Sequence, residues 1–337
     1  MRLRHSAPDG PGIHRRIRGR GFSYTDDAGV RISDDDVLAR ITALAIPPAW
    51  REVWICPHAN GHLQAVGTDA AGRRQYLYHD QWRRDRDEEK FDRVLRFATR
   101  LPRLREQVDA DLGRSGLVRH RVEAVSIGLI DQGVFRVGGE EYAEENGTRG
   151  IATLLRDQVR VHGDDMVFDY VAKGSARRQV EIHDPALARA VRSLRRVRAD
   201  SSRLLVYRED GGYRELHADD INARFRDLAG MECSAKDLRT WQATVHAAEA
   251  LARVDRPTGD RARRRVEREV IAEVAETLGN TSAVARDSYI DPRVLRAFDA
   301  DSTIAAALTR AERRRSRDER RRIVDRAVIR LVRRAPG

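Results

Sequence analysis

Six side chains between residues 136 and 289 are of types that could act on an anionic substrate. In chain order they are Arg136, Lys173, Lys236, Arg239, Asn280 and Tyr289. A tyrosine can supply a nucleophilic oxygen, arginine a fixed positive charge, asparagine an amide donor and lysine a proton. Displacement at a phosphodiester needs a nucleophile, charge stabilisation and a proton for the leaving oxygen. Each residue taken singly is more often structural, so the prediction depends on the ordered series.

Lysine is scarce in this chain, and this makes the two lysines among the six residues stronger candidates for chemistry. The chain has 64 basic residues, of which only Lys90, Lys173 and Lys236 are lysine and the other 61 are arginine. Arginine stays protonated at any ordinary pH, whereas a lysine can give up a proton when its surroundings lower its pKa. A lysine that survives in such a chain is therefore a candidate for proton transfer, although chance survival stays open, most of all for Lys90.

The composition of the chain narrows the classes of partner that it is expected to bind. A net charge of +11 and a pI of about 10.3 favour a polyanion, and nucleic acid is the most common one. No apolar run reaches the roughly 18 residues of a membrane span, and no signal core or P-loop is present. Cys56 and Cys233 stand alone, and no carboxylate cluster indicates a metal. We expect a cytoplasmic, nucleoid-associated protein that requires no metal, nucleotide or other cofactor.

The first part of the chain predicts a small β-rich domain that positions none of the six residues. Residues 1–20 carry six arginines with proline and glycine and are expected to form a flexible basic arm. A helix is expected near 34–44, with Ser33 as its cap. The predicted strands cover 21–25, 29–32, 52–56, 62–67 and 74–78. The domain is expected to span 21–82, with a short linker near 80–90.

The six residues fall in a mainly helical domain, 83–337, that includes a three-stranded meander at 158–162, 166–172 and 177–182. Lys173 lies at a hairpin tip, Lys236 and Arg239 project to similar sides of one helix, and Asn280 follows a helix end. The predicted helices cover 91–112, split or kinked at Pro102, then 118–129, 184–198, 219–229, 236–252, 261–278, 292–299 and a basic 302–333. The predicted fold class is α+β.

The series Arg136, Lys173, Lys236-x-x-Arg239, Leu278-Gly279-Asn280 and Tyr289 resembles the type IB DNA topoisomerases, particularly the compact poxvirus-type branch found in bacteria. The resemblance covers roughly residues 20–300. It includes Gly72-Arg73-Arg74-Gln75-Tyr76-Leu77-Tyr78, similar to the strand with which that branch faces the DNA major groove, and the stretch from Tyr142 to Leu155. It implies a catalytic domain of the tyrosine recombinase and type IB topoisomerase kind.

The resemblance also implies roles. Tyr289 would form a transient 3′-phosphotyrosine, Arg136 and Arg239 would hold the nonbridging oxygens, and Lys173 would protonate the departing 5′ oxygen. Asn280 stands where many relatives carry histidine, and its amide can donate the same hydrogen bond. The DNA contacts expected from the resemblance are those of Arg73, Arg74, Gln75, Tyr76, Tyr78, Tyr142 and Lys236.

The function implied is relaxation of supercoiled duplex DNA by a monomer that clamps it, without ATP or a required metal. The alternative is a tyrosine recombinase, which shares the order Arg, Lys, Arg, Tyr but usually has His-x-x-Arg where this chain has Lys236-x-x-Arg239. A DNA-binding protein without catalysis is the third reading. All reactive positions are present, which argues against it.

Overall fold

The computed structural model describes residues 2–19, 21–140, 143, 147–255 and 257–335. The chain divides into two compact units, Met1–Lys90 and Phe91–Gly337, hereafter the N-terminal and C-terminal units. The division falls inside helix α2 (Asp80–Ala98), so the segment near 80–90 that was expected to link the domains is helical. Among the described residues, no helix is long and apolar enough to cross a membrane.

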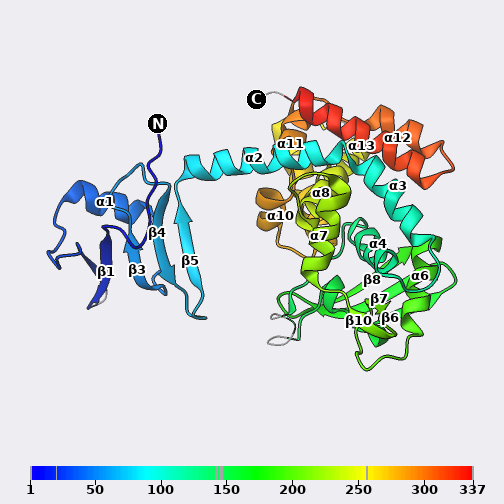
Figure 1. The fold of residues 1–337 in the computed structure, drawn as a ribbon. Helices are drawn as coiled ribbons and strands as arrows, with labels where there is room; N and C mark the ends of the chain where they lie inside the picture. The colour runs from blue at the N-terminus through cyan, green and yellow to red at the C-terminus, as the bar shows by residue number, and fades with distance from the viewer. Residues whose placement is uncertain (1, 20, 141–142, 144–146, 256, 336–337) are drawn as a thin grey trace. The chain divides into compact units, whose positions relative to one another are not determined.

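The N-terminal unit is built on an antiparallel sheet with the strand order β2-β1-β3-β4-β5 (Figure 1). Helix α1 (Asp35–Ala43) buries Ile41 against Val53 and Ile55 of the sheet. The cap of this helix is Asp34, whose carboxylate accepts from the amides of Asp36 and Val37, and not Ser33 as predicted. The strands are β1 (Ile13–Arg18), β2 (Gly21–Thr25), β3 (Arg51–Ile55), β4 (Leu63–Thr68) and β5 (Arg74–Tyr78).

Two further predictions for this unit are wrong. The segment 13–18, expected in a flexible arm, is strand β1, because Ile13 enters the core and Arg15 donates to the carbonyls of Pro47 and Trp50. The strand expected at 29–32 is reduced to a single bridge between Thr25 and Arg31. Paired backbone and anchored side chains outweigh the flexibility that arginine, proline and glycine suggested.

The C-terminal unit is mainly helical and contains the three-stranded antiparallel sheet β6-β7-β8, against which α6 packs (Figure 1). The strands are β6 (Val159–His162), β7 (Asp165–Ala172) and β8 (Ala176–His183), with a separate hairpin β9 (Val206–Glu209) and β10 (Gly212–Glu215). The helices are α3 (Leu101–Leu112), α4 (Arg119–Ile130), α6 (Pro185–Arg195), α7 (Ala218–Ala229), α8 (Ala235–Arg253), α9 (Asp260–Leu278), α10 (Ser282–Ser288), α11 (Pro292–Asp299), α12 (Ala305–Glu312) and α13 (Arg317–Arg334). The predicted α+β class is confirmed.

The core of this unit surrounds α8, where Leu238, Trp241 and Ala247 are buried. The long basic helix expected at 302–333 is wrong: it is two helices, and Ser316 caps the second one by accepting from the amide of Glu319. The break predicted at Pro102 is confirmed, since α2 ends at Ala98 and a new helix starts at Leu101. Hairpin β9–β10 and helix α10 were not predicted.

Candidate functional site

The last turn of α9 gathers three arginines from three different elements. The carbonyl of Thr277 accepts from Arg178 Nη2 at 2.7 Å, and the carbonyl of Gly279 accepts from Arg136 Nη2 at 3.0 Å. The carbonyl of Leu278, between them, accepts from Arg239 Nη2. The last carbonyls of a helix have no partner within the helix and carry its negative dipole end. The end of α9 therefore stabilises positively charged side chains.

Gly279 is the residue that makes this arrangement fit. It ends α9 in the left-handed region at φ 61°, where a side chain is strained. A Cβ added there would lie 1.9 Å from Arg178 Nη1, which is closer than any real contact. The predicted helix end at Leu278-Gly279-Asn280 is thus also the packing surface for Arg178.

Arg136 is fixed by its own backbone. The carbonyl of Arg136 accepts from the amide of Ile151 at 2.9 Å, and the carbonyl of Val137 accepts from the amide of Ala152 at 2.7 Å. A Cβ on Gly150 would lie 2.5 Å from the Cα of Gly138, so the two glycines allow these segments to touch. The side chain of Arg136 then reaches both the carbonyl of Gly279 and Oδ1 of Asn280.

Arg239 is the most enclosed of the cations, with 2% of its surface exposed. It extends from α8, and its Nη1 donates to the carbonyl of Gly133 at 3.2 Å. Burial, and after it the charge of Arg136, lowers the pKa of Arg239 to about 10. Arg239 is still protonated at neutral pH, and its lowered pKa reflects first its burial and then the charge of the neighbouring Arg136.

Two buried donors in the cluster lack a partner in the part of the chain that the structure describes. Among the described residues, neither Nε of Arg239 nor Nδ2 of Asn280 has a hydrogen-bond acceptor. Oδ1 of Asn280 is occupied by Arg136, so the amide presents only its NH₂ group to other partners. Unsatisfied buried donors beside three clustered arginines are the features of a site for an anion with several oxygens.

Tyr289 borders this site. It ends the short helix α10, and its ring centroid lies 5.6 Å from Cζ of Arg239. Its backbone is held by Thr244 of α8, whose Oγ1 lies 3.2 Å from the Tyr289 carbonyl oxygen and accepts from the amide of Asp291 at 3.1 Å. Arg136, Arg239, Asn280 and Tyr289, separated by up to 153 positions in the sequence, are therefore brought to one place.

The two predicted lysines are placed differently. Lys173 lies on the exposed turn between β7 and β8, where Gly174 and Ser175 have φ of 84° and 59°. Tyr170, at the end of β7, is buried, and burial raises the pKa of its phenol against the opposing charges of nearby Arg178, Arg239 and Arg136. Lys173 therefore follows, by three positions, a residue that lies near the arginine cluster. Lys236 lies exposed in the first turn of α8.

Sequence reasoning missed Arg178, Tyr170 and Thr244. Arg178 follows Arg177 in a chain rich in arginine, and only the alternation along β8 separates an exposed Arg177 from a half-buried Arg178. Tyr170 and Thr244 have apolar neighbours in the sequence, a pattern that predicts core residues. None of the three shows a spacing that indicates chemistry.

The residues expected to contact DNA in the N-terminal unit lie on and before β5. Arg73 and Arg74 are exposed, and Arg73 pairs with Asp69, which also accepts from the Gln75 amide at 2.8 Å. Their role in DNA contact stays a prediction.

The two tyrosines of β5 were expected to be exposed or buried together. They share a face, and their rings stack at 6.3 Å. Tyr76 is 47% exposed, whereas Tyr78 is partly buried, so their burial is unequal. Tyr78 packs against an apolar cluster formed by Trp54, Cys56, Leu63 and Val66. Tyr142 lies outside the described residues.

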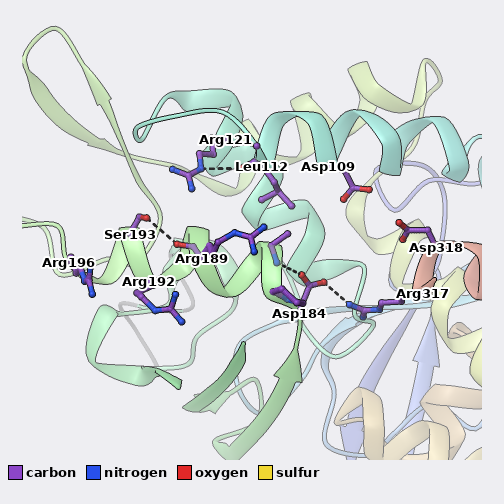
Figure 2. Close-up of a pocket in the computed structure, with 13 residues that line it drawn as sticks. Asp109, Leu112, Arg121, Asp184, Arg189, Arg192, Ser193, Arg196, Arg317 and Asp318 are labelled. Carbon is purple, nitrogen blue, oxygen red and sulfur yellow. Dashed lines mark hydrogen bonds and ion pairs between the residues drawn. The ribbon is translucent and has the colours of Figure 1, made fainter. Parts of the chain in front are cut away.

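A cavity lies elsewhere in the C-terminal unit. This cavity of about 840 Å³ is bordered by α3, α6 and the start of α13, and Figure 2 shows Arg189, Asp184 and Arg317 along it. None of the predicted site residues lines it. Across the described residues, no group of three or more His, Cys, Asp or Glu side chains is arranged to hold a metal ion.

A basic protein with cations clustered around a tyrosine and with unsatisfied donors has a site suited to a phosphate backbone. Comparison with known families extends this result. The family described as eukaryotic DNA topoisomerase I, catalytic core, matches residues 79–315, and bacterial DNA topoisomerase IB, N-terminal domain, matches residues 21–69. The chain belongs to the type IB DNA topoisomerase family, as the sequence predicted.

Individual relatives agree with the family. The chain is 28% identical over 288 residues to DNA topoisomerase 1B of Acanthamoeba polyphaga mimivirus, covering 83% of this chain and 85% of that protein. It is 25% identical over 171 residues to DNA topoisomerase 1B of Vaccinia virus (strain Copenhagen), covering 48% and 54%. A solved structure of the XerH site-specific recombinase bound to difH matches 59% of this chain and 52% of that chain, with 16% identity and a TM-score of 0.36. A likeness that low carries no argument about function.

Proposed function

We propose that the protein relaxes supercoiled duplex DNA by cutting one strand through Tyr289 and resealing it. The observation that carries this proposal is a pair of buried donors, Arg239 Nε and Asn280 Nδ2, that have no partner among the described residues. They lie in the arginine cluster, where Arg239 Cζ is 5.6 Å from the centroid of the Tyr289 ring. A nonbridging phosphate oxygen accepts several hydrogen bonds and would satisfy both donors. The phosphorus would then lie within reach of the Tyr289 oxygen.

In the proposed step, the Tyr289 oxygen attacks phosphorus and releases its proton to water. A bond forms between that oxygen and phosphorus, and the bond from phosphorus to the 5′ oxygen breaks. Arg136 and Arg239 stabilise the charge on the nonbridging oxygens, Asn280 donates one further hydrogen bond, and Lys173 delivers a proton to the leaving 5′ oxygen. The product is a 3′-phosphotyrosine and a free 5′-hydroxyl.

Resealing is the same reaction in reverse. The phosphotyrosine keeps the energy of the broken phosphodiester, so the 5′-hydroxyl can attack it without ATP. Two guanidinium groups already supply positive charge at the phosphate, so a metal is not required. The proposal includes a monomer acting on duplex DNA in the nucleoid. Arg73, Arg74, Gln75, Tyr76, Tyr78, Tyr142 and Lys236 would make the DNA contacts expected from the resemblance.

The test is Tyr289→Phe, with Tyr213→Phe as a matched control on the exposed face of β10. Tyr289→Phe removes only the nucleophilic oxygen, so noncovalent DNA binding should survive while relaxation and covalent adducts disappear. Both variants are incubated with a supercoiled plasmid that lacks recombination sites, and adducts are trapped with denaturant. Adducts formed by Tyr289→Phe would contradict the proposal. Site-specific exchange in place of a topoisomer ladder would favour a recombinase.

A further inference from the structure

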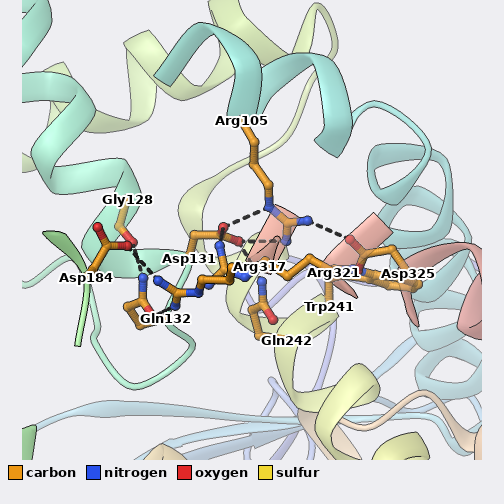
Figure 3. A network of polar contacts seen from close by, with 10 residues as sticks. All are labelled: Arg105, Gly128, Asp131, Gln132, Asp184, Trp241, Gln242, Arg317, Arg321 and Asp325. Carbon is orange, nitrogen blue, oxygen red and sulfur yellow. Dashed lines mark hydrogen bonds and ion pairs between the residues drawn. The ribbon is translucent and has the colours of Figure 1, made fainter. Parts of the chain in front are cut away.

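A buried polar network ties the C-terminal helix α13 to the elements that carry the arginine cluster. Figure 3 shows it around Asp131, the residue that ends α4. The carboxylate of Asp131 accepts from Arg105 at 2.8 and 3.0 Å, from Arg321 of α13 at 3.0 Å and from Gln242 of α8 at 2.6 Å. Four hydrogen bonds on one buried carboxylate leave it little freedom to move.

Asp325 of α13 forms the second centre of this network. One carboxylate oxygen accepts from Trp241 Nε1 at 2.8 Å, and the other accepts from Arg105 Nη1 at 2.6 Å. Both Asp325 and Trp241 are buried. Arg105 therefore bridges Asp131 and Asp325, and the three residues connect α3, α4, α8 and α13.

The network is one turn of helix away from the reactive arginines. Gln242 follows Arg239 by three positions on α8, and its Cβ would lie 3.1 Å from a Cβ on Gly133. Gly133 follows Asp131 by two positions, and its carbonyl accepts from Arg239 Nη1. A shift of α8 against the end of α4 would change this contact directly, and the network resists that shift.

Charge in the network is balanced, in contrast to the arginine cluster. Burial alone would lower the pKa of Arg105, but the carboxylates of Asp131 and Asp325 outweigh it and raise the pKa. Burial likewise opposes ionisation of Asp131, and Arg105 and Arg321 outweigh it, so the pKa of Asp131 is lowered. Arg105 and Asp131 therefore stay ionised at neutral pH. Removing one charge would leave a buried partner uncompensated, and the helices would readjust.

We infer that Asp325, through Arg105 and Asp131, is a positioning residue that fixes Arg239 against Arg136 for the cleavage step. The inference rests on the proposed function. It assigns a role to α13 (Arg317–Arg334), which lies beyond residues 79–315 matched by the topoisomerase catalytic core. Asp325 touches no reacting atom, and it acts through the elements that hold the arginines.

The first test is Asp325→Asn, which keeps an oxygen for Trp241 but removes the charge opposite Arg105. Its control is Glu312→Gln, the same loss of charge on an exposed residue of α12. Adduct formation on a duplex oligonucleotide is followed under single-turnover conditions with excess enzyme. We expect Asp325→Asn to slow it by about 10- to 100-fold, the scale of a roughly 1 Å misplacement. Asp325→Glu should recover part of the loss, and Glu312→Gln should stay within about twofold of the parent.

A double-variant comparison separates positioning from general loss of structure. In the Arg239→Ala background, Asp325→Asn should slow adduct formation by less than about twofold, because the group it positions is gone. DNA affinity, measured in the Tyr289→Phe background, should be nearly unchanged by Asp325→Asn. The same slowing in both backgrounds, or no slowing of the single variant, would overturn the inference.

Gln242→Ala is the second route if Asp325→Asn does not fold. It removes one donor to Asp131 from α8 and should show the same dependence on Arg239. Equal effects of Gln242→Ala with and without Arg239 would again overturn the inference. The parent enzyme in each series reports on the proposed function. If the parent enzyme forms no adduct, the proposed function is refuted. If the parent forms adducts and the variants form them at the same rate, only the positioning role is refuted.

Discussion

Asn280 divides its amide between two tasks. Its oxygen accepts a hydrogen bond from Arg136. Its nitrogen is a buried donor that has no acceptor among the described residues. The oxygen therefore orients the nitrogen, so that the donor is in place before a phosphate arrives. Preorganised donors of this kind contribute most where charge develops in the transition state.

Asn280→Asp tests this division because it keeps the shape and the oxygen for Arg136 but replaces the donor with an acceptor. We expect cleavage to slow by about 10²–10³-fold, as when one oxyanion donor is lost. Asn280→His is the matched variant: it restores a donor and should retain most activity. It should also add a decline as pH rises through the histidine pKa, near 6.5, because a neutral ring donates less strongly. The measurement is adduct formation against pH, and full activity of Asn280→Asp would contradict the role.

Lys173 can be separated from the arginines by the chemistry of the leaving group. Lys173→Arg keeps the charge but cannot deliver a proton at neutral pH, so cleavage should slow by about 10²–10⁴-fold. A substrate with a 5′-bridging sulfur needs no proton and should rescue Lys173→Arg and Lys173→Ala. It should not rescue Arg239→Ala to a similar degree, because that loss concerns the nonbridging oxygens. If sulfur rescues neither Lys173 variant, Lys236 becomes the candidate acid.

At the scale of elements, the end of α9 is more than a helix terminus. Three consecutive carbonyls hold Arg178, Arg239 and Arg136, which come from β8, α8 and the segment after α4. Side chains from distant parts of the chain are thus aligned by one turn of backbone. Repulsion among the three cations is offset locally by the negative end of the helix.

Gly279→Ala tests the helix end without touching a reactive group. The new methyl group would meet Arg178 Nη1 at 1.9 Å and would strain a backbone at φ 61°. We expect a loss of about 1 kcal/mol or more in the free energy of unfolding, and slower cleavage as the arginines are displaced. Gly113→Ala is the control, since Gly113 has a right-handed backbone at the end of α3. Normal cleavage by Gly279→Ala would show that the alignment is not needed.

Periodicity and turn residues predicted much of the scaffold. Strand β5 and helix α11 were expected at 74–78 and 292–299, and these are their bounds, because alternation, Asp291 and Pro292 mark them locally. Helix α10 has only seven residues and one buried side chain, too few to show a period. Strand β1 was missed because Ile13 enters the core by pairing with Ile55 of β3, a partner far along the chain.

The residues of the site likewise differ in whether the sequence could predict them. Arg136, Arg239, Asn280 and Tyr289 were chosen from their order along the chain, and the structure brings them together. Arg178 could not be chosen, because one arginine among 61 is distinguished only by the glycine against which it packs. Contacts between side chains and backbone carbonyls leave no periodic mark in a sequence.

At the scale of the whole molecule, the charge of +11 governs how the protein meets DNA. Relaxation should proceed in EDTA without a nucleotide, because the phosphotyrosine keeps the bond energy and the guanidinium groups supply the charge. Binding should weaken steeply with added salt as counterions are taken up again by the DNA. Plasmid relaxation in EDTA and a salt titration of binding measure both effects. An absolute need for magnesium would contradict the mechanism, whereas mild stimulation through faster release would not.

The contact between Gly138 and Gly150 fixes the ends of the stretch that follows Arg136. Gly138 touches Gly150 where Arg136 and Val137 pair with Ile151 and Ala152, so the stretch between them is joined at its two ends. Lengthening a loop whose ends are already joined costs little, about 0.6 kcal/mol for each doubling. We therefore expect relatives to exchange or extend this stretch, which includes Tyr142, and so to acquire new sequence preferences. Arg136 would keep its position throughout such divergence.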